Sequence, residues 1–119
     1  MGNRSEIIVQ SDSFASNLVF YGHWSGTDNL LAVARVLQRT DRVGDPSYLA
    51  AQVYFEFAVN LGQTDGNLSF GIRASDGTEW VMCDEPPVYL NADTGEVVYQ
   101  DMTLSKDTLK GLLLDSLTK

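Results

Sequence analysis

The residues best suited to chemistry in this chain lie in one short stretch, residues 20–28. The stretch contains the single histidine, His23, and one of the two tryptophans, Trp24. An imidazole can act as a base or a hydrogen-bond partner, and an indole ring can stack on a planar ligand. Gly26 and Thr27 follow at an expected helix start, where free backbone N–H groups attract anions. This stretch is therefore the first candidate for a binding site.

Catalysis is less favoured by the same residues. Ser25 and Asp28 are the nearest nucleophile and acid for His23, but neighbouring side chains at a strand end point apart, and no Gly-x-Ser-x-Gly motif is present. One His and one Cys are too few for a zinc centre, and no Asp-Gly turn continues into a calcium loop. We expect a binding protein with no catalytic residues, no metal and no cofactor. A small hydrolase that uses His23 is the less favoured alternative.

The elements around this stretch are expected to hold it at the rim of a sheet. Residues 6–10 and 18–23 have the patterns of two strands joined by a polar turn. Apolar residues then recur at helical spacing, at Leu30, Val33 and Leu37. The junction between the second strand and this helix therefore carries His23 and Trp24.

The rest of the chain predicts an α+β domain. A second helix begins at Asp45 and Pro46, an N-cap followed by a first-turn proline, and it is apolar on nearly all sides over residues 48–59. Such a helix is expected in a core or in a subunit contact. Four strands are predicted next, at residues 68–74, 79–83, 88–91 and 96–100.

Residues 104–118 are predicted to form a C-terminal amphipathic helix, which packs on its own subunit or on a neighbouring one. The order ββ-αα-ββββ-α predicts one domain, residues 1–119, with helices packed on an antiparallel sheet of about five or six strands.

Composition limits the class of partner. The 119 residues carry a net charge of −8, which disfavours nucleic acid and anionic membranes as partners. Cys83 stands alone, so no internal disulfide is expected, and no apolar run is long enough to span a bilayer. We expect a cytoplasmic protein. The apolar excess of the second and last helices favours a homo-oligomer, a dimer or higher.

Aromatic rings, a helix start and arginines together are what a nucleotide-like anion requires. Arg35, Arg39 and Arg42 form a basic patch, and Arg73 lies on the polar face of its strand. The predicted ligand-binding residues are Tyr21, His23, Trp24, Ser25, Gly26, Thr27 and Arg73. The alternative for each residue is structural, with the indole in the core and the imidazole on a backbone carbonyl.

Two segments resemble motifs of small proteins encoded by phages and prophages. They are Val-Phe-Tyr-Gly-His-Trp-Ser-Gly at 19–26 and Gly-Asp-Pro-Ser-Tyr-Leu-Ala-Ala at 44–51. That group typically has Arg-His-Trp-Asp-Gly at the first place and a Tyr-Leu-Ala-Ala-like helix start at the second. This chain departs from it with Gly22 for Arg and Ser25 for Asp. The resemblance, over residues 18–100, implies an accessory protein that acts in a host cytoplasm, with counter-defence as its role.

We therefore expect a phage-type binding protein that sequesters a small anionic, nucleotide-like ligand. The alternative is a protein–protein interaction or inhibitor module that binds a host protein.

Overall fold

The computed structural model describes residues 4–23, 26–60, 70–75 and 86–117 of the chain. The strands in these ranges are β1 (Arg4–Gln10), β2 (Asn17–His23), β3 (Phe70–Ser75), β4 (Val88–Asn91), β5 (Val97–Tyr99) and β6 (Met102–Leu104). The helices are α1 (Gly26–Arg39), α2 (Pro46–Asn60) and α3 (Lys106–Leu117). The α+β class and the element order ββ-αα-ββββ-α are confirmed.

The six strands form one sheet in the order β3-β2-β1-β4-β5-β6. The sheet is mixed, whereas we expected antiparallel pairing throughout, because β1 and β4 run parallel with Ile7 opposite Val88. The chain between these two strands includes α1 and α2, and a long crossover of this kind is what parallel neighbours need. The other neighbouring pairs are antiparallel, as expected.

One strand in the described residues was not predicted. β6 follows β5 after a two-residue turn at Gln100 and Asp101, whose φ angles are 51° and 65°. Two successive positive φ values make a type I′ hairpin turn, which Asn-Gly and Asp-Gly usually form. Gln-Asp does not carry that signal. The predicted strand at residues 79–83 lies outside the described residues.

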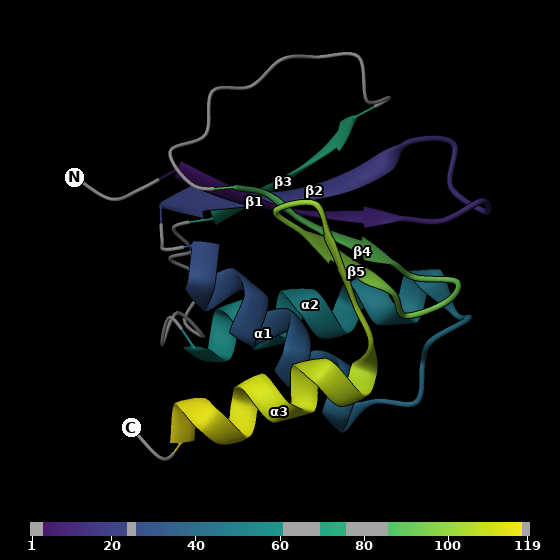
Figure 1. The fold of residues 1–119 in the computed structure, drawn as a ribbon. Coiled ribbons are helices and arrows are strands. Elements are labelled where there is room, and N and C mark those ends of the chain that lie inside the picture. The colour runs from purple at the N-terminus through teal and green to yellow at the C-terminus, as the bar shows by residue number, and fades with distance from the viewer. Residues whose placement is uncertain (1–3, 24–25, 61–69, 76–85, 118–119) are drawn as a thin grey trace.

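The three helices cover one face of the sheet, as Figure 1 shows. α1 packs on β1 and β4, and both α2 and α3 pack against α1. The helical stripe predicted from Leu30, Val33 and Leu37 is buried against the sheet. These contacts fix the direction in which α1 leaves the end of β2.

α2 and α3 complete the core of the chain. Phe57 of α2 contacts the rings of Phe20 and Phe70 edge-on, with centroids 6.0 and 5.4 Å apart. α3 packs within its own chain through Leu109, which is fully buried. Its start is capped by Ser105, whose Oγ accepts a hydrogen bond from the Thr108 N–H at 3.2 Å. No helix in the described ranges is long and apolar enough to cross a membrane.

Candidate functional site

The junction predicted from the sequence exists in the fold. β2 ends at His23, which lies opposite Arg4 of β1, and α1 begins at Gly26. Trp24 and Ser25 lie outside the described residues, as do the side chains of His23 and Thr27. The ligand-binding roles of these residues and of Gly26 therefore stay predictions.

Tyr21 and Arg73, two other residues predicted to bind ligand, lie together on the sheet face opposite the helices. The Arg73 Cζ is 5.2 Å from the centroid of the Tyr21 ring. The ring lies over Gly71, its neighbour on β3, where an added Cβ would come within 2.5 Å of the Tyr21 hydroxyl. A side chain at this point would require the Tyr21 ring to move. Cross-strand pairing therefore brings Tyr21 and Arg73 together although they are 52 positions apart in the sequence.

The sequence did not single out Glu6, which completes this group. Arg73 Nη2 donates to Glu6 Oε2 at 2.6 Å, and the Glu6 side chain is only 9% exposed. Glu6 lies directly opposite Tyr21 on β1, so the Arg73 side chain reaches across β2 to meet it. The positive charge of Arg73 is thus compensated inside the protein, and an anion would have to compete with Glu6 for it.

A buried polar pair lies between β1 and the first turns of α1. Asn29 is fully buried, and its Nδ2 donates to the Oγ of Ser5 at 2.9 Å. The Asn29 Oδ1 has no hydrogen-bond partner among the described residues. A buried carbonyl without a partner costs about 1–3 kcal/mol of folding free energy.

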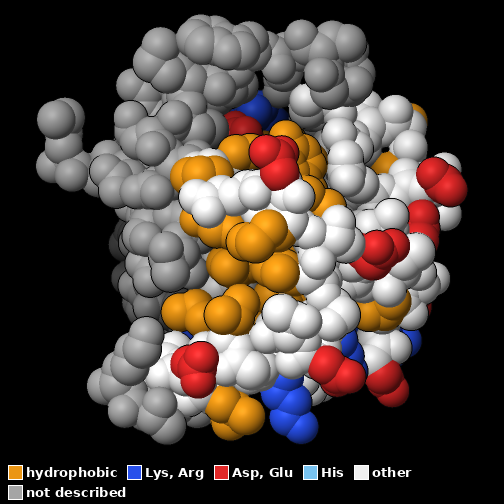
Figure 2. Space-filling view, in the orientation of Figure 1, with side chains coloured by type: hydrophobic (Ala, Val, Ile, Leu, Met, Phe, Trp, Pro, Cys, Tyr) orange, Lys and Arg blue, Asp and Glu red, His pale blue; other side chains and the backbone are white. Residues whose placement is uncertain are grey.

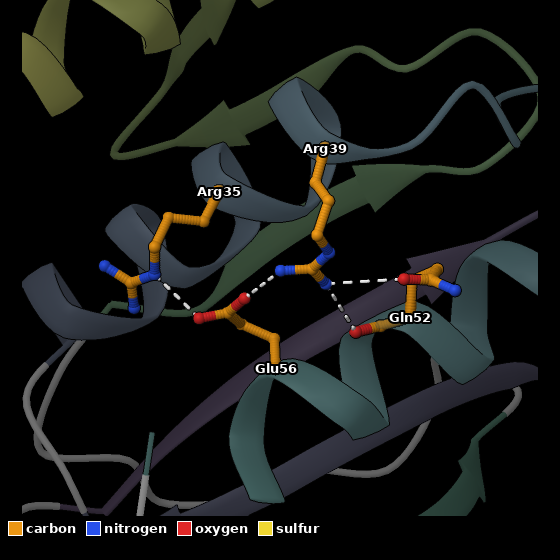
Figure 3. A network of polar contacts seen from close by, with 4 residues as sticks. All are labelled: Arg35, Arg39, Gln52 and Glu56. Carbon is orange, nitrogen blue, oxygen red and sulfur yellow. Dashed lines mark hydrogen bonds and ion pairs between the residues drawn. The ribbon is translucent and has the colours of Figure 1, made fainter. Parts of the chain in front are cut away.

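A second polar group joins α1 to α2, as Figure 3 shows. The buried carboxylate of Glu56 accepts a hydrogen bond from Arg35 Nε at 2.7 Å and another from Arg39 Nη1. Burial raises the pKa of Glu56, but the hydrogen bonds and charges of the two arginines outweigh it and hold this pKa below its ordinary value. Glu56 is therefore ionised at neutral pH and fixes two guanidinium groups at the helix surface.

Beside this group, α2 exposes a row of side chains that we call the α2 surface: Tyr48, Gln52, Phe55 and Val59, together with Arg39 and Arg42. At about 100° per residue, Tyr48, Phe55 and Val59 share one side of the helix. Tyr48 is 56% exposed and Phe55 is 52% exposed. The Arg42 Cζ lies 4.7 Å from the Tyr48 ring centroid, and the Arg39 Cζ lies 5.3 Å from that of Phe55. This surface thus alternates aromatic rings with cations.

The sequence anticipated only part of the α2 surface. The sequence predicts the basic patch at Arg35, Arg39 and Arg42, and the apolar character of α2 predicts a helix in a core or a subunit contact. Leu49, Val53 and Phe57 do pack in the core. The opposite side of α2 faces solvent, which its uniform hydrophobicity could not reveal.

A shallow cavity of about 310 Å³ lies between the end of α1, the β4–β5 turn and the start of α3. Its lining is mixed in charge and includes Asp41, Glu96 and Lys106. It includes none of the predicted ligand-binding residues and no residue of the α2 surface. Among the described residues, no group of three or more His, Cys, Asp or Glu side chains could hold a metal ion.

Comparison with family models, with curated proteins and with solved structures finds no match for this chain.

Proposed function

We propose that this chain is a protein-interaction module that docks a partner protein on its α2 surface. In keeping with the phage-type resemblance, it would act as an accessory protein on a host protein in the host cytoplasm. The observation that carries this proposal is the exposure of Tyr48 and Phe55 on a helix whose other side is already packed.

The size of the apolar area supports a docking role. Tyr48 and Phe55 are each about half exposed, and so is Val59 on the same side of α2. At roughly 200 Å² for each ring, the two rings together present about 200 Å² of aromatic surface to solvent, to which Val59 adds. The largest apolar patches on monomeric proteins reach a few hundred Å² and often mark interaction sites. Aromatic and arginine side chains are also the ones enriched at the centres of protein interfaces.

The shape of the surface favours a protein over a small molecule. Small ligands bind in concave sites that bury most of their surface. The α2 surface is the exposed side of a helix, and the cavity near the end of α1 does not reach Tyr48 or Phe55. A flat row of rings and guanidinium groups suits a second protein surface, which can cover it entirely.

Photo-crosslinking tests the proposal in the full chain. A photo-reactive phenylalanine analogue replaces Phe55 in one sample and Leu114 in the control, because Leu114 is 55% exposed on α3. We expect a discrete adduct with another protein from position 55 and none from position 114, and Tyr48→Ala should abolish that adduct. Equal labelling at both positions, or none at position 55, would contradict the proposal.

Binding of a small anionic ligand at the β2–α1 junction is the second candidate function. It is favoured by the strand end at His23, the helix start at Gly26 and the contact of Arg73 with the Tyr21 ring. A thermal-shift screen with mono-, di- and cyclic nucleotides tests it, since a ligand at 100 times its Kd should add about 2.7 kcal/mol of stability. If no nucleotide in the screen raised the stability, the docking of a partner protein would remain as the proposed function.

A further inference from the structure

The carboxylates near the α2 surface do not fully neutralise its arginines. The ion pairs at and beside this surface join Arg39 and Arg42, together with the adjacent Arg35 of α1, to two carboxylates, Glu56 and Asp45. One positive charge is therefore in excess within this network, on a chain whose net charge is −8. On another face of the molecule, the one seen in Figure 2, carboxylates are scattered among a few basic side chains.

The guanidinium groups are held in place but keep donors to spare. Arg35 bonds Glu56 through Nε, and its two Nη groups have no hydrogen-bond partner in the described part of the chain. Arg39 Nη2 has only long contacts with Gln52, at 3.4 and 3.5 Å, and Arg42 meets Asp45 at 3.5 Å. A half-exposed pair at that distance contributes little, so a better-placed carboxylate can replace it.

The rings beneath two of these arginines make them good carboxylate receptors. Phe55 and Tyr48 contact Arg39 and Arg42 through their ring faces. A ring contact of this kind is not a hydrogen bond to an oxygen, so it leaves the N–H donors that make no other contact available to an incoming carboxylate. Both side chains are already ordered by these contacts, which lowers the entropy lost when a partner binds.

We propose that the partner segment on the α2 surface is an acidic amphipathic helix of another protein, a conclusion that rests on the proposed docking function. Tyr48 and Phe55 are seven residues apart, which is about 10.5 Å along the axis of α2. A helix lying along α2 therefore presents carboxylates at positions i and i+7 to Arg39 and Arg42, with apolar side chains between them to cover the rings. A second copy in a symmetric α2-to-α2 contact would place arginine against arginine, which disfavours it.

A matched pair of helical peptides tests this proposal. One alanine-based peptide carries Glu at i and i+7 and Leu at i+3 and i+4, and the other carries Lys in place of Glu. We expect the full chain to bind the Glu peptide and not the Lys peptide in fluorescence anisotropy. The double variant Arg39→Gln/Arg42→Gln should bind the Glu peptide about tenfold more weakly, because two charge-assisted contacts are lost.

The control for that variant is Lys106→Gln/Lys110→Gln, which removes the same charge from the exposed surface of α3 and should bind like the wild type. Equal binding of the two peptides, equal losses in the two double variants, or no peptide binding at all would overturn the acidic helix as partner. Concentration-dependent self-association that Tyr48→Ala abolishes would overturn it too, in favour of a second copy. The crosslink at position 55 reports on the docking function separately, since it requires no particular charge in the partner.

Discussion

α1 and α2 are neighbouring helices of similar length on the same sheet, yet they differ in how many of their apolar side chains are buried. The apolar side chains of α1 are nearly all buried, and Val33 and Val36 are completely inaccessible. α2 buries Val53 and Phe57 on one side and exposes Tyr48 and Phe55 on the other. The core accounts for the apolar residues of α1 and for only half of those of α2.

This difference distinguishes apolar residues that stabilise the fold from apolar residues that are available to a partner. A ring in the core stabilises the fold by roughly 25 cal/mol for each square ångström of apolar surface removed from water. A half-exposed ring contributes much less to folding, so selection for stability alone does not explain two of them in one row. The arginines over Tyr48 and Phe55 add contacts worth about 0.5–1 kcal/mol at exposed sites, which orient the side chains without burying them.

The largest effect is expected from the same substitution made on the two sides of α2. Phe57→Ala removes a buried ring that contacts Phe20 and Phe70, and it should lower the free energy of unfolding by about 3–5 kcal/mol. Phe55→Ala, two residues earlier, should lower it by less than about 1 kcal/mol. Urea unfolding followed by circular dichroism measures both. Similar losses for the two variants would mean that Phe55 is a core residue and that the two sides of α2 do not differ.

The next largest effect on stability is expected from the ionic contact between α1 and α2. Glu56→Gln keeps the shape of the side chain but removes the charge that Arg35 and Arg39 meet, and it should cost about 1–3 kcal/mol at pH 7. The pKa of Glu56 is lower in the folded protein than the ordinary value of 4.5, so the unfolded chain binds the proton more readily. The stability contributed by the ionised group is therefore present above the ordinary pKa and is lost as pH falls through the folded pKa.

The measurement for Glu56 is urea unfolding of both proteins from pH 7 downward. The wild type should lose stability more steeply than Glu56→Gln below the ordinary pKa, and the two curves should converge at the lowest pH. Parallel curves would show that Glu56 is not linked to folding by its charge.

Much of the fold was predictable because local chemistry and the tertiary structure agree. The spacing of Leu30 and Leu37 predicts α1, and the N-cap at Asp45 followed by Pro46 predicts the start of α2. The structure contains both helices. β6 was missed because its turn uses Gln100 and Asp101 at positive φ, a geometry that these residue types seldom adopt. The parallel pairing of β1 and β4 was missed because it depends on a crossover and not on a local turn.

The candidate site was less predictable, because it too depends on contacts between residues far apart in the sequence. The Glu6–Arg73 ion pair spans two strand pairings, and the Arg35–Glu56 pair joins two helices, so neither is a local pattern in the sequence. The exposure of Phe55 depends on where α2 lies against the sheet. The sequence could identify the arginines and rings as candidates but could not show that they form one surface.

A smaller effect tests whether the packing of α1 is complete. Asn29 is the buried amide whose Oδ1 lacks a partner in the described residues, so an apolar side chain of similar size removes that cost together with the hydrogen bond from Asn29 to Ser5. Asn29→Leu should stay within about 1 kcal/mol of the wild type, whereas Asn29→Ala should lose about 1–2 kcal/mol to the cavity it leaves. Thermal unfolding measures both variants. A larger loss of stability for Asn29→Leu than for Asn29→Ala would show that the polar contacts of the amide stabilise the fold. The buried face of α1 would then contribute more than apolar packing.

The smallest change in stability is expected on the α2 surface, where the change in binding should be greatest. Tyr48→Ser removes a ring that is more than half exposed, and Leu114→Ser removes an equally exposed side chain from α3. Each should alter the free energy of unfolding by no more than about 0.5–1 kcal/mol, because little buried area is lost. Binding of the acidic peptide should fall for Tyr48→Ser and remain unchanged for Leu114→Ser, as anisotropy titrations will show. If both variants bind equally well, the rings of α2 are no more than exposed apolar residues, and the contrast between the two helices has no functional meaning.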